Sequence, residues 1–289
     1  MPPLRQVNIH VERPLEAGVV NHQQNQWGFQ FEKVLVNASQ EMVYSLTSKD
    51  ILSSALDGYS GCILCYGQTG AGKTFTITGA QNDYKYRGVV PRILSALYQD
   101  INTRYDHQIK VSISYLELYN ESLVDLLDEN NNAQLSIQED QKGYVLVKGL
   151  TRKGADNEEA ALQILFEGEN NKTVAEHKLN KNSSRAHSIF TVHLEIRSRV
   201  ESSEKVIMSK INLVDLAGSE RVKKTGSEGQ TLIEAQNINR SLSYLEQVVV
   251  ALSDQQRDHI PYRQAKLTYL LKDSIGGNSK TCMIANIWP

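Results

Sequence analysis

The sequence predicts an α/β fold, with a central, mostly parallel mixed β-sheet and helices on both of its faces. Short apolar runs typical of buried strands alternate along the chain with stretches of helical periodicity. No internal repeat or Pro- or Ser-rich linker interrupts the chain, so we expect residues 1–289 to form a single domain. The composition, 40% hydrophobic and 22% charged, is ordinary for a globular protein.

The first half of the chain supplies four of the expected elements. Residues 27–36 predict a strand that leads into a turn, and residues 39–57 carry apolar side chains at helical spacing. Residues 62–67 form a short apolar run, which is typical of a buried strand. Residues 111–120 have period-two character and predict a further strand.

The second half gives the clearest periodicities. Residues 189–198 alternate, which places one apolar set on one face of a strand: Phe190, Val192, Leu194 and Ile196. Residues 210–218 predict a buried strand that ends in a glycine turn. Residues 236–252 predict an amphipathic helix with one apolar side: Ile238, Leu242, Leu245, Val249 and Leu252.

Composition and charge exclude several classes of protein. The net charge is −2, so the chain as a whole is not a polycation built to bind nucleic acid. No apolar run approaches the ~20 residues that span a bilayer, and the first residues lack the apolar centre of a secretory signal. Cys62 and Cys65 form a C-x-x-C inside an apolar run, which favours buried strand cysteines over a redox or metal site. We therefore expect a reduced, intracellular protein.

The strongest local motif is GQTGAGKT, which matches the phosphate-loop pattern G-x-x-x-x-G-K-[ST]. Glycines allow the backbone N–H groups to wrap around phosphates. The lysine supplies a cation to the β- and γ-phosphates, and the threonine hydroxyl is a Mg²⁺ ligand. The motif and the next residue define the predicted nucleotide site: Gly67, Gln68, Thr69, Gly70, Ala71, Gly72, Lys73, Thr74 and Phe75.

Two later segments are candidates for sensing the γ-phosphate. Asp215 ends the apolar run KINLVD, as does the acid that holds Mg²⁺ in phosphate-loop enzymes, and Gly218 offers a backbone N–H. The segment NKNSSRAH, residues 180–187, contributes the hydroxyls of Ser183 and Ser184, which are expected to reach the metal or the attacking water. Of the two, Ser184 is the proposed metal ligand. Arg185 and Glu220 carry opposite charges and are expected to bridge the two loops.

With these segments in place, the sequence resembles the kinesin motor domain. The resemblance rests on five segments in the expected order: GQTGAGKT (67–74), SYLELYNESLVDLL (114–127), NKNSSRAH (180–187), DLAGSER (215–221) and HIPYRQAKLTYLLKDSIGG (259–277). Two stretches are most similar to the ninth kinesin class, whose members work in cilia and flagella: YGQTGAGKTFTITGA and INRSLSYLEQVVVALSDQQRDHIPYR.

The resemblance implies a phosphate-loop fold of the kinesin type, an ATP and Mg²⁺ site, and two switch loops. It assigns Ser183, Ser184 and Arg185 to the first switch, and Asp215, Gly218 and Glu220 to the second. It also makes Asn239 the start of a relay helix. Finally, it implies that a microtubule binds a basic surface: Lys223, Lys224, Arg257, Arg263 and Lys266. Residues 221–280 hold nine Lys/Arg against six Asp/Glu, which suits an acidic partner.

Three departures from the family pattern stand out. The VERP segment (11–14) lies where the family's second strand is expected, so we expect the first strand and its adenine wall to be absent or altered. Ala186 replaces the last serine of the first switch. The sequence stops before the family's final helix and neck linker, with no coiled-coil heptads, so we expect a monomeric fragment.

The leading hypothesis is a microtubule-stimulated Mg-ATPase that converts ATP hydrolysis into movement. The alternative is a microtubule-binding module that turns over ATP poorly, which the absent first strand and Ala186 favour. A GTPase-like switch is disfavoured because no N-K-x-D element for reading guanine is present. We expect no nucleic acid or membrane partner, and a place on the cytoplasmic cytoskeleton or in a cilium.

Overall fold

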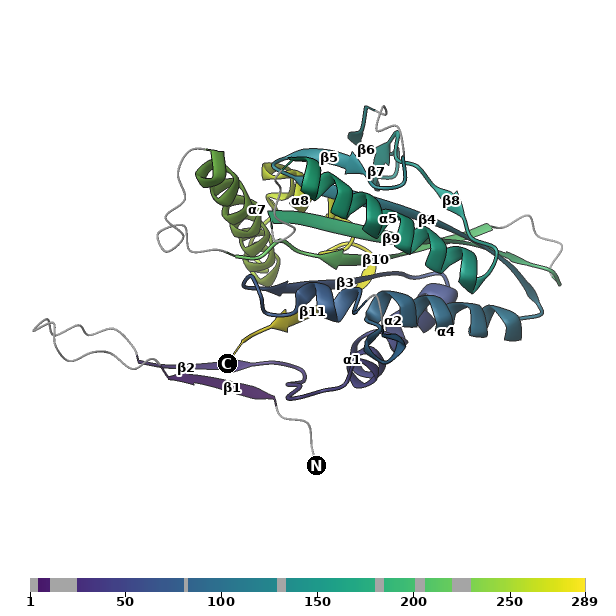
Figure 1. The fold of residues 1–289 in the computed structure, drawn as a ribbon, viewed down its shortest axis with the longest axis horizontal. Coiled ribbons are helices and arrows are strands. Elements are labelled where there is room, and N and C mark those ends of the chain that lie inside the picture. Colours follow the sequence, from purple (N-terminus) through teal and green to yellow (C-terminus); the bar gives the residue numbers. More distant parts are fainter. Residues whose placement is uncertain are drawn as a thin grey trace, which may run out of the picture.

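A computed structural model of the chain shows a sheet between two layers of helices (Figure 1). The structure describes residues 5–10, 25–80, 83–128, 134–179, 185–200, 206–219 and 230–288. Within those ranges, none of the helices combines the length and the apolar character needed to cross a membrane.

The central sheet has the strand order β11–β3–β10–β9–β4–β5, with β8 also paired to β4. The strands are β3 (Ser60–Gly67), β4 (His107–Tyr119), β5 (Ser122–Asp125), β8 (Lys153–Gly154), β9 (Ala186–Ser198), β10 (Val206–Asp215) and β11 (Ser279–Asn286). Parallel pairing is concentrated in β11, β3 and β10, and the other pairs are antiparallel. The expected mixed α/β sheet is confirmed.

Two smaller sheets and the helices complete the described fold. The antiparallel pairs are β1 (Gln6–His10) with β2 (Gln26–Gln30), and β6 (Ser136–Glu139) with β7 (Val145–Lys148). The α-helices are α1 (Gln40–Thr47), α2 (Lys49–Leu56), α3 (Lys73–Ile77), α4 (Val89–Thr103), α5 (Glu158–Leu179), α7 (Gln230–Ser253) and α8 (Lys266–Leu270). Short 3-10 turns are η2 (Tyr84–Tyr86) and η4 (Tyr262–Gln264). The β1–β2 pair extends away from the central sheet (Figure 1).

Alternate residues of the same strands enter two separate cores, because successive side chains of a strand point to opposite faces. Ile63 and Cys65 of β3 join a core with helices α2, α4 and α5. Cys62 and Leu64 of the same strand join a second core with α7 and α8. The sheet is therefore covered by helices on both faces, as the sequence predicts.

The C-x-x-C segment behaves as expected for a strand. Cys62 and Cys65 are buried free thiols that lie on opposite faces of β3. Burial raises the pKa of the Cys62 thiol to about 12, which suppresses thiolate chemistry. In the part of the chain that the structure describes, no group of three or more metal-ligating His, Cys, Asp or Glu side chains occurs.

Four sequence-derived details differ from the structure. Asn239, expected to begin a relay helix, lies within α7, which begins at Gln230. The strand expected over 27–36 covers Gln26–Gln30, and the helix expected over 39–57 is divided at Ser48 into α1 and α2. Val249, expected on the buried side of the 236–252 helix, is 42% exposed, whereas Val248 is 1% exposed. Val248 faces the core shared with α8, so tertiary packing selects it over its neighbour.

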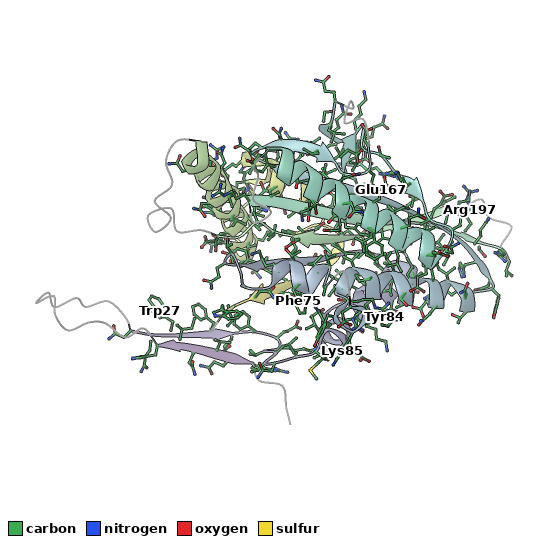
Figure 2. The ribbon with its side chains drawn as sticks, viewed as in Figure 1. Trp27, Phe75, Tyr84, Lys85, Glu167 and Arg197 are labelled. Atoms are coloured by element: carbon green, nitrogen blue, oxygen red, sulfur yellow. The ribbon has the colours of Figure 1, made fainter. Side chains whose placement is uncertain are left out.

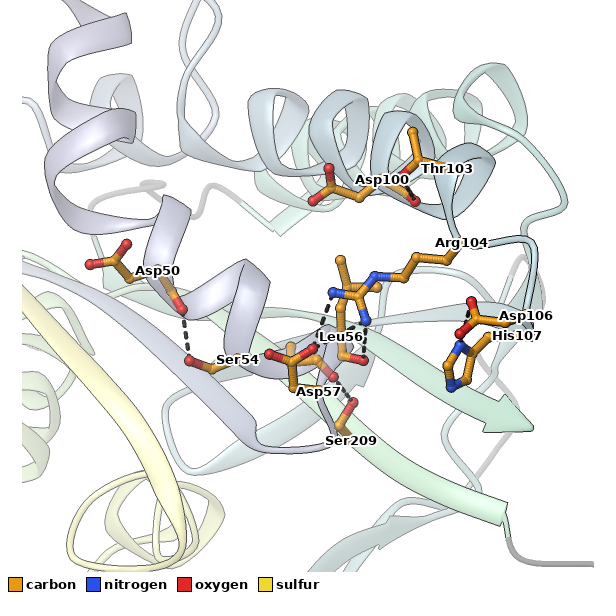
Figure 3. A network of polar contacts seen from close by, with 11 residues as sticks. Asp50, Ser54, Leu56, Asp57, Asp100, Thr103, Arg104, Asp106, His107 and Ser209 are labelled. Carbon is orange, nitrogen blue, oxygen red and sulfur yellow. Dashed lines mark hydrogen bonds and ion pairs between the residues drawn. The ribbon is translucent and has the colours of Figure 1, made fainter. Parts of the chain in front are cut away.

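The end of the sheet remote from the phosphate loop is fastened by polar contacts (Figure 3). Arg104, which follows α4, donates to the Leu56 carbonyl at 3.2 Å and to the Asp57 carboxylate at 3.1 Å. Ser209 of β10 donates to the Ala55 carbonyl at 2.7 Å. These contacts satisfy carbonyls at the carboxyl end of α2 and join it to α4 and β10.

Candidate active site

Residues 67–74, the phosphate loop, connect buried strand β3 to helix α3. The backbone of Gly70 and Gly72 has φ of +83° and +89°, and a Cβ at either position meets nothing within 4 Å. These are left-handed conformations that glycine adopts without strain. The loop therefore forms an open backbone cradle at the start of α3, which is the arrangement that binds phosphate groups.

The base of the loop packs against the last residue of β11. A Cβ on Gly67, whose φ is +153°, lies 2.2 Å from the Asn286 carbonyl oxygen, so a larger residue does not fit. The Asn286 amide also donates to the Thr76 hydroxyl at 2.9 Å. Strand β11 thus fixes both the entry to the loop and the helix that follows it.

Lys73 is 7% exposed, and its ammonium group donates to the Gln68 carbonyl at 2.9 Å, across the loop. Burial lowers the pKa of Lys73, and the nearby Asp215 carboxylate opposes that shift. The side chain is thus a buried cation held over the cradle. A cation in this position is suited to bind a polyphosphate.

Thr74 and Asp215 meet across the gap between α3 and the end of β10. The Thr74 hydroxyl donates to Asp215 Oδ2 at 2.6 Å. Burial raises the pKa of the Asp215 carboxyl, while Lys172, Thr74 and Lys73 act in the opposite direction. Oδ1 of Asp215 is buried and has no hydrogen-bond partner among the described residues. A hydroxyl and a carboxylate with a spare oxygen are hard ligands, so these residues fit Mg²⁺.

Gly218 lies directly against the phosphate loop. A Cβ there is 2.1 Å from Thr69 Oγ1 and 2.8 Å from the Thr69 backbone nitrogen. A parallel bridge between Gln68 and Ser219 continues the β3–β10 pairing past the ends of both strands. The predicted second-switch glycine and the phosphate loop are therefore in contact, and glycine is required by space.

Sequence reasoning missed a set of buried charges behind Asp215. Helix α5 contributes Glu169 and Lys172, which are 7% and 6% exposed. Tyr115 of β4 donates to Glu169, and Lys172 lies 3.5 Å from the Ser188 hydroxyl. Burial and the Glu169 carboxylate both raise the pKa of Tyr115. Two charges within one helix give no local sequence signal, because only the fold brings them to Asp215.

Phe75, included in the predicted ATP site, lies at the start of α3 with 47% of its surface exposed. Its ring centroid is 6.2 Å from that of Tyr86, and Figure 2 shows it on the side of the sheet that faces the β1–β2 pair. The Gln40 amide donates to the Phe75 carbonyl at 2.6 Å, which fixes the backbone. The exposed ring offers an apolar face beside the phosphate cradle.

Part of the predicted site lies outside the described residues: Ser183, Ser184, Glu220, Lys223 and Lys224. VERP lies outside them as well. Arg185 is described and is half-buried just before β9. The expected Arg185–Glu220 bridge and the hydroxyl roles of the first switch therefore stay predictions.

The described members of the predicted basic surface are exposed but have acidic neighbours. Arg263 lies 3.1 Å from Glu139, and Arg257 lies 3.8 Å from Asp254. The Lys266 ammonium donates to the Glu121 carbonyl at 2.6 Å. The side chain of Arg263 is nevertheless 74% exposed, so it remains accessible to a partner.

Comparisons with known proteins agree with this geometry. The family model described as "Kinesin motor domain" matches residues 5–289. The chain is 53% identical to the human kinesin-like protein KIF9 and 49% identical to the kinesin-like protein KLP1 of Chlamydomonas reinhardtii. In each case 98% of this chain is covered, and the chain spans 36% of the relative's length.

A solved structure described as that of a fast kinesin, with implications for ATPase mechanism and interactions with microtubules, gives a TM-score of 0.84. It is 38% identical, and the match covers 91% of this chain and 74% of the solved one. The phosphate cradle, the Thr74–Asp215 contact and the Gly218–Thr69 contact are thus built into a fold shared with that motor. The chain belongs to the kinesin motor domain family, most like its ninth class.

Proposed function

We propose that this chain is the motor domain of a microtubule-stimulated Mg-ATPase that converts ATP hydrolysis into movement along microtubules. The observation that carries the proposal is the meeting of Lys73, Thr74 and Asp215 at one edge of the sheet. A buried cation beside a hydroxyl–carboxylate pair supplies the phosphate-binding and Mg²⁺-holding groups that phosphate-loop enzymes use in phosphoryl transfer.

The chain's own groups have distinct tasks in this proposal. Backbone N–H groups of residues 67–74 and the Lys73 ammonium bind and orient the phosphates, and Phe75 packs against the base. Thr74 and Asp215, with Ser184 of the first switch, hold Mg²⁺, which neutralises charge on the phosphate oxygens. Gly218 presents its backbone N–H to the terminal phosphate, and Ser183 positions the attacking water.

The first and second switches close through an Arg185–Glu220 ion pair in this proposal. Such a pair stabilises the closed, hydrolysis-competent arrangement more than it stabilises nucleotide binding. Glu220→Ala is expected to keep ATP affinity and to lose most microtubule-stimulated turnover. Arg185→Glu combined with Glu220→Arg is expected to recover part of it, and an unaffected Glu220→Ala protein contradicts this pairing.

The microtubule is proposed to bind the face formed by α7, η4 and α8, which are in mutual contact. This face carries Arg257, Arg263 and Lys266, and Lys223 and Lys224 precede α7 in the sequence. The similarity to KIF9 and KLP1 supports a place on the cytoskeleton, and the ninth-class resemblance supports a cilium or flagellum.

ATP turnover with and without microtubules tests the proposal. We expect turnover to rise on adding microtubules. The alternative, a microtubule-binding module with impaired nucleotide handling, is favoured by Ala186 in the first switch. Fluorescent-ATP binding and microtubule co-sedimentation separate the two: a protein that sediments with microtubules but neither binds nor hydrolyses ATP supports the alternative and overturns the motor proposal.

A further inference from the structure

His187, the second residue of β9, lies where three parts of the molecule meet. Its side chain is 3% exposed. The backbone N–H of Ala217 donates to Nδ1 at 3.0 Å, and Nε2 lies 2.9 Å from the Ser241 hydroxyl of α7. One imidazole therefore joins the strand after the first switch, the backbone just before Gly218, and the long helix α7.

The hydrogen bonds that link Ala217, His187 and Ser241 form a series in which each group donates to the next. A backbone N–H can only donate, so Nδ1 of His187 accepts and its proton resides on Nε2. Nε2–H then donates to Ser241, whose hydroxyl donates to the Ile238 carbonyl at 2.8 Å. Burial, with a smaller contribution from Lys73, lowers the pKa of His187 to about 3. The neutral tautomer that this series of hydrogen bonds requires is thus the form present at neutral pH.

The backbone at Ala217 and Gly218 cannot move without affecting its hydrogen-bonded and packed neighbours. Gly218 is packed against Thr69 of the phosphate loop, and Ala217 is the preceding residue. A displacement of Gly218 by a phosphate group shifts Ala217, and it must either break the bond to His187 or pull on Ser241. The Ser241 hydroxyl is 54 residues from His187 in sequence and belongs to the helix that borders η4 and α8.

We propose that His187 is a positioning residue that couples the backbone at Ala217 to helix α7 through Ser241, so that the phosphate site and the track-facing helix move together. The inference rests on the proposed motor function. It concerns how the two sites of that function communicate, and His187 need not contact nucleotide.

Two substitutions separate the two bonds of the imidazole. In His187→Asn, the side-chain oxygen takes the place of Nδ1 and still accepts from Ala217, but the side chain is too short to reach Ser241. In His187→Gln, the amide takes the place of Nε2 and still reaches Ser241, but the bond to Ala217 is lost. Ser241→Ala removes the same link as His187→Asn by deleting one hydroxyl, which disturbs the fold least.

The same strand supplies a matched control. His193, six residues further along β9, is half-buried, and its Nε2 lies 3.0 Å from the Ser114 hydroxyl of β4. This pair joins two strands that are already hydrogen-bonded to each other. His193→Asn, whose side chain is too short to reach Ser114, and Ser114→Ala each remove this His–Ser bond without touching either switch or α7.

The experiment measures ATP turnover with and without microtubules, together with urea unfolding, for each variant. We expect His187→Asn, His187→Gln and Ser241→Ala to lower the microtubule stimulation at least tenfold. The His193→Asn and Ser114→Ala controls should keep the parent's stimulation. The double variant His187→Asn with Ser241→Ala should be no worse than either single one, since both break one link.

Full microtubule stimulation in Ser241→Ala overturns the inference. It is also overturned if the controls lose stimulation in the same proportion to their loss of stability as the His187 and Ser241 variants do. Additive losses in the double variant overturn it too. If the parent itself shows no stimulation, the proposed function fails, and the inference falls with it. Failure of the inference alone appears in the variants, while the parent is still stimulated.

Discussion

Strands β9 and β10 each have one end at the phosphate loop and one end far from it, and the two ends hold similar polar groups in different roles. Near the loop, His187 bonds to Ala217 and Ser241, and Asp215 bonds to Thr74. Away from the loop, at the level where β3 begins, which we call the far end, His193 bonds to Ser114, and Lys210 lies 3.3 Å from Asp273. Both places therefore combine a His–Ser pair with a lysine and a carboxylate, fully buried only near the loop.

The difference lies in what the partners belong to. At the far end the polar contacts join elements that are already fixed, as the Arg104 contacts to Leu56 and Asp57 also do (Figure 3). At the loop end they join separate parts: a loop, two strand ends and a helix. A buried polar pair stabilises a protein in either place, but it can transmit motion only where its partners are able to move relative to each other.

The largest expected effect is on ATP turnover, when the lysine at the loop end is compared with the lysine at the far end. Lys73→Ala removes the buried cation of the cradle, and we expect ATP turnover to fall at least ~100-fold, because electrostatic stabilisation dominates this reaction. Lys210→Ala removes a half-buried lysine at the far end and should leave turnover near the parent's. Steady-state turnover measures both, and similar losses in the two variants contradict the assignment of the phosphate loop.

The next largest effect is expected when alanine replaces a glycine beside the phosphate loop rather than a glycine far from it. Gly218→Ala places a Cβ 2.1 Å from Thr69 Oγ1, and we expect it to cost about 1–3 kcal/mol in stability and to impair turnover. Gly154→Ala in β8 meets nothing within 4 Å, so a change within about 0.5 kcal/mol is expected. Urea unfolding gives both values. Equal tolerance at the two positions means that the loop is not packed as described.

The far-end histidine has a predictable effect on acid stability. Burial, followed by Arg152 and Lys210, lowers the pKa of His193 to about 3. Because this folded value is below the unfolded one, the stability contribution is complete above pH ~6.5 and is lost as the pH falls.

Between pH 7.5 and 5 the parent should lose on the order of 1–2 kcal/mol of unfolding free energy through this group. His193→Gln keeps the bond to Ser114 and should lack that part of the loss. Urea unfolding at the two pH values measures it, and an equal pH dependence in parent and variant shows that His193 does not titrate in this way.

The smallest single-residue effects are expected on the exposed basic face. Lys224→Ala, Arg263→Ala and Lys266→Ala together should weaken microtubule binding and flatten its salt dependence, while ATP binding is retained. Each exposed charge is worth less than about 1 kcal/mol, so the triple variant is needed. Arg197→Ala, which removes an exposed arginine paired with Glu195 at the far end, is the control. Equal binding by parent and triple variant contradicts the proposed docking face.

The sequence predicted the elements whose signals are local. The alternation of 189–198 placed Phe190 and Val192 on one buried face of β9, and the structure agrees. The period of 236–252 predicted α7 but chose Val249 over Val248, because helical spacing defines a side of a helix and not the neighbours that cover it. The division of 39–57 at Ser48 was likewise invisible to periodicity.

The sequence by itself determined the phosphate loop, because residues 67–74 are contiguous and their backbone conformation follows from their own glycines. It also determined that Asp215 ends a buried strand. Tertiary structure alone decided that Asp215 meets Thr74, 141 residues away, that Lys172 stands behind it, and that His187 reaches Ser241. The physical reason is that parallel strands β3 and β10 end at the same edge of the sheet, so groups remote in sequence converge there once the sheet is packed.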